Sequence, residues 1–323
     1  MPAVRIARDE GVRDRGQRVR RRRRMRRAPV TGSRCDGARA APRVRADGTT
    51  AAHGDLGHAE PLAAALARHR PDCVIHLAAE IATQRDATKI EEVNVHGTSR
   101  LLAACETAGG IRFVFMSTVA TGDAGDAGGA VLDESSVLPV HTAYGRSMQR
   151  GEQLVRDAGI PGVILRPSHV YGAGGWYAAE LVKRLRQPGR FVVISSGQNW
   201  WDVVRVEDVA RACVDAAERA PDGAIYHVAD DEPITQYDFV ALTAQALGVG
   251  RPRKVPAWLA SLATGADAVR AVTRSARSSN RHLKQELGWE PRFPPAQEGA
   301  PRRRRAHRAL TGIGPDPQRL GCW

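Results

Sequence analysis

Two hydroxyl side chains and one phenol occupy positions where they can take part in proton transfer. Ser117 and Thr118 directly follow the apolar stretch 113–116, and Tyr144 comes at the start of a stretch with helical patterning. Hydroxyls and phenols donate and accept hydrogen bonds, and a phenol with a lowered pKa exchanges protons at neutral pH. A lone tyrosine at a helix start is usually a packing residue, so this interpretation depends on its surroundings.

A second group of residues closes another apolar strand with small side chains. The stretch 72–79 contains Cys-Val-Ile-His-Leu and ends in Ala78 and Ala79, which leave room for a flat cofactor to approach the backbone. Further upstream, Asp55 can accept a hydrogen bond from an adenine amino group or cap the helix that follows. Each signal is weak when taken alone.

The elements that must position these residues alternate between strand and helix patterns. Apolar runs of strand length occupy 72–79, 111–116, 162–166 and 224–228, and helical spacing marks 61–68, 90–108, 144–158, 206–218 and 235–247. Strands buried on both faces and separated by helices predict a parallel sheet covered by helices. Because such crossovers are right-handed, we predict a Rossmann-like, doubly wound α/β fold with a small C-terminal α/β lobe.

The order and spacing of six short motifs resemble the NAD-dependent epimerase/dehydratase family of extended short-chain dehydrogenase/reductases, over about residues 47–299. The matching pieces are Ser117-Thr118 followed by Tyr144, Leu165-Arg166-Pro167 with Val170-Tyr171-Gly172, the stretch Asn94–Thr98, the stretch Val204–Ala210, Tyr226-His227-Val228-Ala229, and Leu287-Gly288-Trp289-Glu290-Pro291. The resemblance implies NAD or NADP as cofactor and redox chemistry at a carbinol carbon of a small-molecule substrate, which we expect to be a nucleotide sugar. It also implies a homodimer through the helix that carries Tyr144 and the helix before it.

The resemblance assigns a role to each candidate residue. Tyr144 is the expected general acid/base, and Thr118 hydrogen-bonds the substrate oxygen. The expected cofactor-binding residues are Asp55, Leu56, Leu77, Ala78, Ala79, Asn94, Ser117, Tyr144 and Pro167. The expected substrate-binding residues are Glu80, Thr118, His169, Trp201 and Arg205.

Position 148 departs from the family pattern, because it holds Met where the family has Lys four residues after the tyrosine. That Lys lowers the phenol pKa and holds the nicotinamide ribose, whereas Met has no charge and no donor. Arg146 and Arg150 fall on other faces of the predicted helix. We therefore predict weak or absent turnover, and a non-catalytic nucleotide-binding or regulatory relative is the alternative.

Two further departures concern the substrate and the cofactor phosphates. Trp201 stands where nucleotide-sugar epimerases often carry an Arg that grips the diphosphate, and Arg205 stands where His is common. The strand and glycine-rich turn that bind the pyrophosphate are also missing, since Val30-Thr31-Gly32-Ser33 is not continued as that motif requires. We predict that the first strand, turn and helix of the fold are atypical or absent.

The two ends of the chain differ from its middle in charge. Residues 1–46 hold 16 Arg and four acidic residues, and 292–323 hold seven Arg and two acidic residues, so 47–291 has a net charge of −4 within a total of +13. GC-rich codons for 14–21, read one base later, can encode Thr-Gly-Ala-Asn-Gly-Phe-Val-Gly, which is the missing turn. We favour this shifted frame over an Arg-rich nucleic-acid arm or a processed targeting segment, so nucleic acid is not the expected partner.

Composition along the chain gives our expectations about domain boundaries, membrane segments and cysteines. We divide the chain into 1–46 (Arg-rich, disordered), 47–172 (an incomplete NAD(P)-binding domain), 173–299 (a substrate lobe with elements that return to the core) and 300–323 (an Arg-rich, disordered tail). No apolar run reaches the roughly 20 residues that span a bilayer, and the five Cys form no metal or disulfide pattern. We predict a cytoplasmic protein with no metal site and no membrane partner.

Overall fold

The computed structural model describes residues 5–7, 54–122, 126–136, 139–187 and 191–293. Its main sheet has five strands in the order β1-β2-β3-β5-β10. Four of them, β2 (Cys73–His76), β3 (Arg112–Met116), β5 (Gly162–Pro167) and β10 (Ile225–Val228), run parallel, while β1 (Arg5–Ala7) pairs antiparallel with β2 at the edge. The predicted doubly wound fold is confirmed.

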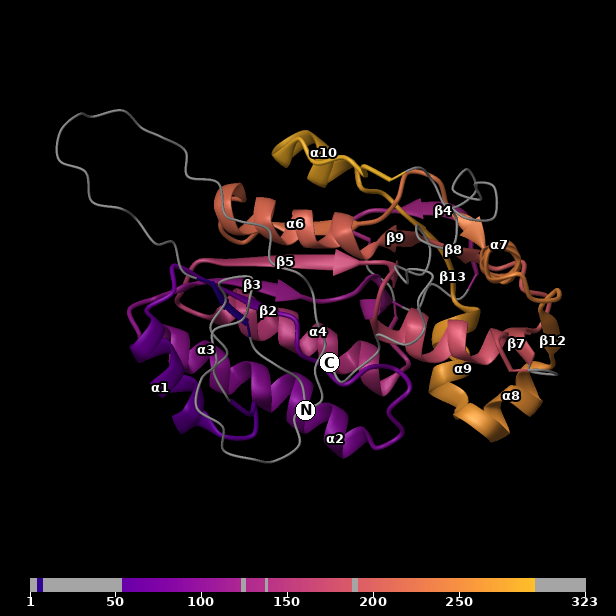
Figure 1. The fold of residues 1–323 in the computed structure, drawn as a ribbon. Coiled ribbons are helices and arrows are strands. Elements are labelled where there is room, and N and C mark those ends of the chain that lie inside the picture. The colour runs from indigo at the N-terminus through magenta and orange to yellow at the C-terminus, as the bar shows by residue number, and fades with distance from the viewer. Residues whose placement is uncertain (1–4, 8–53, 123–125, 137–138, 188–190, 294–323) are drawn as a thin grey trace.

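Helices cover both faces of this sheet (Figure 1). One layer contains α1 (Ala59–His69), α2 (Ala87–Glu91), the π-helical turn η1 (Glu92–His96), α3 (Gly97–Thr107) and α4 (Ala143–Asp157). The other layer contains α6 (Val206–Arg219) and α10 (Arg281–Leu287). Val74, Val114 and Val163 of the central strands are completely buried between the two layers, which explains why the middle positions of these strands are apolar.

The C-terminal lobe is built from short paired strands and short helices. Parallel pairs join β4 (Asp126–Leu132) to β13 (Ser275–Ser278), β6 (His169–Tyr171) to β9 (Val203–Arg205), and β7 (Phe191–Ile194) to β12 (Arg253–Val255). An antiparallel pair joins β8 (Trp200–Trp201) to β11 (Ile234–Thr235). The helical elements are η2 (Val119–Thr121), η3 (Tyr177–Val182), α5 (Lys183–Leu185), α7 (Gln236–Leu247), α8 (Ala257–Thr264) and α9 (Ala266–Thr273).

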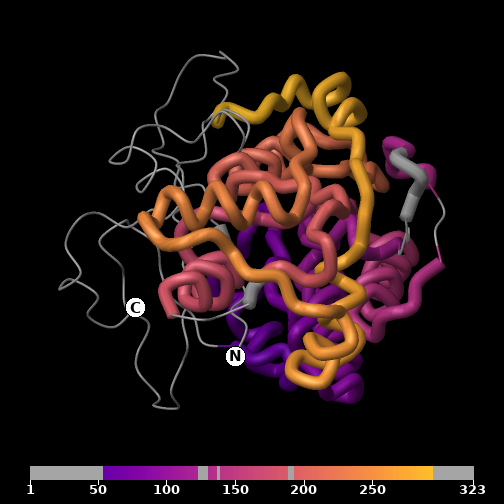
Figure 2. Tube along the Cα trace, turned by 90° about the vertical axis from the view of Figure 1, so that its right-hand side faces the viewer, coloured from indigo at the N-terminus to yellow at the C-terminus, as the bar shows by residue number. Residues whose placement is uncertain are grey.

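The last segment of the described chain ties the lobe to the sheet. Figure 2 shows the chain running from α8 and α9 back along the side of the molecule to α10. There α10 packs on β10, and Trp289 is buried with its indole N–H donating to the Asp208 carbonyl at 3.2 Å. The end of the described chain therefore packs into the core beside the main sheet, while the lobe also has a hydrophobic cluster of its own around Tyr177 and Phe239.

Several expectations concern residues outside the described ranges. The missing glycine turn, the shifted-frame stretch 14–21 and the tail 300–323 all lie there, and of residues 1–46 only Arg5–Ala7 is described. Among the helices of the described ranges, none is long and apolar enough to cross a bilayer.

Candidate active site

Thr118 and Tyr144 meet at the carboxyl edge of the sheet, where β3 ends and α4 begins. Thr118 caps η2, and its Oγ1 accepts a hydrogen bond from the Ala120 N–H at 3.2 Å. Tyr144 is the second residue of α4, which begins at the cap Thr142, whose Oγ1 accepts from the Gly145 N–H at 3.0 Å. The Thr118 side chain hydrogen-bonds the Tyr144 hydroxyl. The structure thus brings together the two residues that the sequence placed 26 positions apart.

A glycine next to the tyrosine makes this approach possible. A Cβ atom at Gly145 would lie 2.7 Å from the Ala120 carbonyl oxygen and 2.8 Å from Cγ1 of Val140. Real Cβ atoms do not come that close to a backbone oxygen, so any other residue would push α4 away from η2. Gly145 therefore sets the distance between the helix that carries Tyr144 and the turn that Thr118 caps.

The surroundings of Tyr144 hold it in the protonated form. Burial raises the pKa of Tyr144 to about 12, and the hydrogen bond from Thr118 opposes that rise only in part. A phenol with this pKa is a proton donor at neutral pH and a very poor base.

Met148 occupies the next turn of the same helix face. Its side chain is buried, and its Sδ lies 3.7 Å from Nδ2 of Asn94. Arg146 instead donates to the His141 carbonyl at 2.8 Å, and Arg150 forms an exposed ion pair with Glu91. Neither arginine replaces the missing ammonium, as the helix-face argument predicts.

Asn94 joins the end of β2 to α4. Its Oδ1 accepts from the Glu80 N–H at 2.8 Å, and its Nδ2 donates to the Glu80 carbonyl at 3.0 Å and to Ser147 Oγ at 2.9 Å. Asn94 lies within the π-helical turn η1, and such turns occur often at functional sites. The residue that the resemblance assigns to holding the strand ends together makes contacts of that kind.

The described residues fit a nicotinamide dinucleotide in part. At the end of β2, Ala78 and Ala79 add little bulk and Leu77 is exposed, which leaves the backbone accessible to a flat group. Leu56 is buried against α3, where a Cβ at Gly97 would lie 2.9 Å from its Cβ. Asp55 Oδ1 accepts from the Gly57 N–H at 2.9 Å, so one carboxylate oxygen is used locally.

Positions 167 and 148 are the ones that the resemblance places at the nicotinamide end of the cofactor. Pro167 ends β5 beside Ser117, whose N–H donates to the Leu165 carbonyl at 2.7 Å. Position 148 offers no donor toward a ribose, because it is Met.

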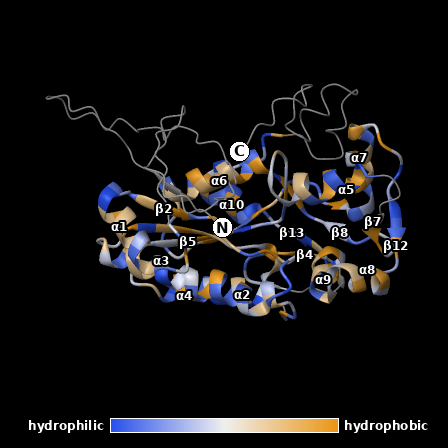
Figure 3. Cartoon of the chain, turned by 60° about the horizontal axis from the view of Figure 1, so that its bottom comes forward, coloured by the Kyte–Doolittle hydropathy of each residue, from blue (hydrophilic) through white to orange (hydrophobic). Residues whose placement is uncertain are grey.

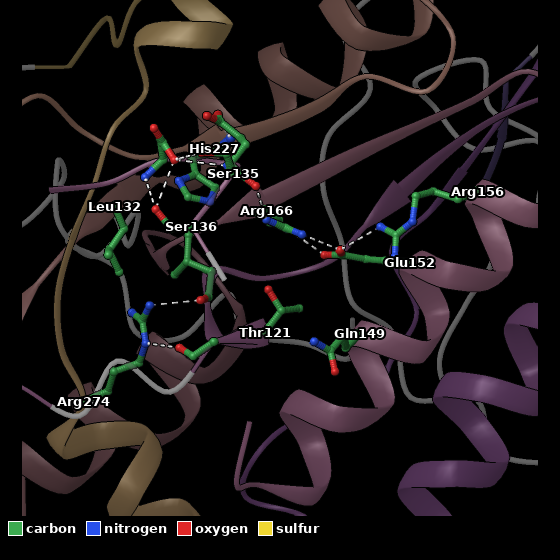
Figure 4. A pocket seen from close by; sticks show the side chains of 14 residues that line it. Thr121, Leu132, Ser135, Ser136, Gln149, Glu152, Arg156, Arg166, His227 and Arg274 are labelled. Atoms are coloured by element: carbon green, nitrogen blue, oxygen red, sulfur yellow. Dashed lines mark hydrogen bonds and ion pairs between the residues drawn. The ribbon is translucent and has the colours of Figure 1, made fainter. Parts of the chain in front are cut away.

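A buried ion pair behind this site was not anticipated from the sequence. Glu152 of α4 is completely buried and receives two hydrogen bonds from Arg166 of β5, at 2.8 and 2.6 Å. Ser117, expected at the cofactor, donates its hydroxyl to Glu152 Oε1 at 2.5 Å. Figure 4 shows this pair beside a pocket of approximately 160 Å³ that also contains His227 and Arg274. The spacing of Tyr144, Met148 and Glu152, four residues each, was the signal that could have revealed it.

The expected substrate residues fall into two groups. Glu80, which follows the end of β2, forms an ion pair with Lys89 at 3.0 Å. His169 stacks on buried Trp201 with ring centroids 4.4 Å apart, and its Nδ1 lies 3.1 Å from the Asp202 carbonyl. Since a carbonyl only accepts, the proton sits on Nδ1 and Nε2 is an acceptor. Burial, together with Arg274, lowers the pKa of His169 to about 4, so the ring is neutral at pH 7.

Arg205 is enclosed rather than presented to a ligand. It is buried, donates to both carboxylate oxygens of Glu207 at 3.0 and 2.8 Å, and lies over the rings of Tyr171 and Phe293. The indole N–H of Trp201 donates to the Val272 carbonyl at 2.9 Å. A role for either residue in binding substrate stays a prediction.

Comparison with known proteins identifies the family of this chain. The model of the NAD dependent epimerase/dehydratase family matches residues 14–229, a range that begins within the Arg-rich segment. A 3-diazoavenalumate denitrifying reductase from a Streptomyces species is 29% identical over 252 residues, covering 74% of this chain and 82% of that protein. A 4-hydroxy-2-methyl-3-oxo-4-farnesyl-3,4-dihydroquinoline-1-oxide ketoreductase from Stigmatella aurantiaca is 31% identical over 65% of this chain and 64% of its own length.

A solved structure shows the same architecture. The crystal structure of a dTDP-glucose 4,6-dehydratase from Streptomyces venezuelae with NAD bound superimposes with a TM-score of 0.66 at 25% identity. The match covers 79% of this chain and 77% of that one.

Proposed function

Because the chain belongs to the NAD dependent epimerase/dehydratase family, we propose that it is an NAD(P)-dependent oxidoreductase that reduces a carbonyl group to a carbinol. The observation that carries this proposal is the hydrogen-bonded pair of Thr118 and Tyr144, with Tyr144 held as a phenol. Two of the relatives described above are named as reductases, which supports the reductive direction.

The proton chemistry follows from the pKa of Tyr144. With a pKa of about 12, only about one molecule in 10⁵ carries a phenolate at pH 7, so removing a proton from an alcohol is strongly disfavoured. Donating a proton to a carbonyl oxygen is favoured, because that oxygen becomes much more basic as it gains negative charge. A reduced nicotinamide, when bound, would supply the hydride that the carbonyl carbon needs. Tyr144 supplies the proton to the oxygen and then recovers a proton from water.

Thr118 positions the substrate oxygen. Its own oxygen accepts from the Ala120 N–H, and its O–H, which donates to the Tyr144 hydroxyl in this structure, would turn to a substrate oxygen that enters between the two groups. Two donors, Thr118 and Tyr144, then face one substrate oxygen, an arrangement that stabilises the negative charge that develops there.

Met148 limits the rate of this reaction. A lysine at that position would place a positive charge near the phenol and a donor near the ribose, and its absence removes both. We propose that turnover is lower by at least about 10²-fold than with a lysine at this position.

We propose a nucleotide sugar with a keto group as the substrate. The similarity to a dTDP-glucose 4,6-dehydratase supports this choice. The neutral His169, with Nε2 as an acceptor, suits a sugar hydroxyl that donates a hydrogen bond. Because Glu207 engages Arg205, the diphosphate must be held by other groups.

A direct assay tests the proposal. The full chain is incubated with NADH or NADPH and dTDP-4-keto-6-deoxyglucose, and consumption of the reduced cofactor is followed by absorbance. We expect slow turnover that Tyr144→Phe lowers by roughly 10²–10⁴-fold. Tyr237→Phe, which removes a hydroxyl from the C-terminal lobe, should leave the rate unchanged. Equal rates for the wild type and Tyr144→Phe would refute the role of Tyr144.

A second candidate is a nucleotide-binding relative without catalytic activity, which the buried Met148 favours. It predicts that NADH or NADPH binds by calorimetric titration while the wild type does not turn over. Measurable turnover in the wild type excludes it.

A further inference from the structure

Helix α8 exposes an apolar face that packs on nothing in the described structure. Trp258 is 68% exposed, Leu262 is 74% exposed and Leu259 is 45% exposed. Residues three and four positions apart lie on the same side of a helix, so these three side chains form one patch. Single exposed leucines are ordinary, but an exposed tryptophan beside two exposed leucines marks a surface that meets an apolar environment.

The rest of α8 is firmly attached to the protein. Ala260 on its inner side is buried, and α8 packs against α9. The Arg85 guanidinium donates to the Ala263 carbonyl in the last turn of α8. The exposed face therefore belongs to a fixed helix.

Basic residues lie beside this patch. The segment directly before α8 contains exposed Arg251, Arg253 and Lys254. Its strand β12 pairs with β7, and β7 packs against α5, where Lys183 and Arg186 are exposed. Figures 1 and 3 show β7, β12 and α8 together at one end of the molecule. Acidic side chains at this end have partners within the protein: Glu180 pairs with Arg184, Asp267 of α9 accepts from the Ala143 N–H, and Asp238 of α7 accepts from the Thr235 hydroxyl.

We propose that this end of the C-terminal lobe docks on an anionic lipid surface, with Trp258, Leu259 and Leu262 inserted at the headgroup level. An aromatic and aliphatic face with basic residues beside it is the pattern of helices that lie in the membrane interface. Such docking needs no membrane-spanning helix, so it revises only the expectation that the protein has no membrane partner. A second copy of the chain fits the patch poorly, because two basic surfaces would repel each other.

The docked end connects directly to the candidate active site. Asp267, in the first turn of α9, accepts a hydrogen bond from the Ala143 N–H at 3.0 Å, at the start of the helix that carries Tyr144. A lipid surface at α8 would therefore lie on the lobe that braces the start of α4.

Vesicle sedimentation tests the proposal with the full chain. We expect the protein to pellet with vesicles of phosphatidylcholine that contain roughly a third phosphatidylserine, and to stay in the supernatant with phosphatidylcholine alone. Trp258→Ser combined with Leu262→Ser should lower the bound fraction about tenfold or more. Lys183→Glu combined with Arg251→Glu should do the same and should remove the salt dependence.

Matched controls keep the result unambiguous. Val131→Ser removes another exposed apolar side chain, away from α8, and should leave vesicle binding unchanged. The melting temperatures of all variants should match the wild type, because the substituted side chains are exposed. The proposal is overturned if the wild type does not bind anionic vesicles, or if the serine double variant binds as well as the wild type. It is also overturned if light scattering shows a dimer that this double variant dissociates.

Discussion

Two neighbouring turns of α4 differ in the charge of the side chain that each one buries. Met148 stands one turn after Tyr144 and brings an uncharged side chain to a place where a cation would assist the phenol. Glu152 stands one turn later and carries a carboxylate into complete burial, where Arg166 and Ser117 satisfy it. Both side chains lie on the face that packs against the sheet.

This difference shows that a charge that stabilises the fold and a charge that assists catalysis need different surroundings. A buried charge that is fully paired holds elements together, and here it fixes α4 against β5. A charge that assists catalysis must stay close to the reacting group without being neutralised by a partner. The described part of α4 carries the first kind at Glu152 and an uncharged Met148 beside Tyr144, so no cation on this helix face opposes the rise in the Tyr144 pKa that burial causes.

Removing the paired charge should have the largest effect. Glu152→Ala leaves the largely buried Arg166 guanidinium, whose side chain is 14% exposed, without its carboxylate, which we expect to lower the free energy of unfolding by about 3 kcal/mol. Urea unfolding measures this loss. Glu180→Ala removes an exposed ion pair with Arg184, which lies outside α4. It should lower the free energy of unfolding by less than about 1 kcal/mol. Equal losses for the two variants would show that burial does not set the importance of the pair.

Supplying the missing charge should have the next largest effect. Met148→Lys should raise kcat for carbonyl reduction by about 10²-fold, which corresponds to about 2.7 kcal/mol. Met148→Leu keeps the volume and the neutrality, so its rate should match the wild type. If the Lys and Leu variants are equally fast, the absent ammonium is not what limits the reaction.

Separating the two site residues should have a moderate effect. Gly145→Ala places a methyl group against the Ala120 carbonyl, and we expect a loss of about 1–3 kcal/mol in stability. A lower kcat should accompany this loss, because Tyr144 moves away from Thr118. At Gly159 a Cβ would meet nothing within 4 Å, so Gly159→Ala is the matched control and should be neutral. Unchanged stability and kcat in Gly145→Ala would contradict the proposed spacing role.

The smallest expected effect is that of pH on the wild-type rate. Reduction needs the protonated phenol, whose pKa is about 12, so its population is lost only as pH rises toward that value. We therefore expect kcat to vary by less than about twofold from Tyr144 titration between pH 6 and 9. In Met148→Lys the added charge lowers this pKa, and the decline at high pH should move to lower pH. A wild-type rate that falls steeply near pH 8 would disprove the raised pKa.

Much of the fold was predictable because its elements carry local patterns. The helix predicted at 144–158 is found at Ala143–Asp157, and the strand predicted at 162–166 is found at Gly162–Pro167. Apart from β4, the strands of the lobe, such as Trp200–Trp201, have only two to four residues and therefore show no periodicity that a sequence pattern could reveal.

The sequence predicted which residues form the candidate site better than it predicted which side chains they contact. Thr118, Tyr144 and Asn94 could be named from motif order, and the structure places them around one edge of the sheet. The partners of Ser117 and Arg205 could not be named, because pairs such as Ser117 with Glu152 join separate elements of the fold.

The sequence by itself determined the family, the order of the elements and the substitution of Met for Lys at position 148, since each is written in residue types and spacing. Only the tertiary structure decided that Glu152 is buried with its partner, that Arg205 is enclosed by Glu207, and that no described segment covers the apolar face of α8. Burial and pairing depend on which distant segments pack together, and an apolar side chain has the same identity whether it faces a core or the surface.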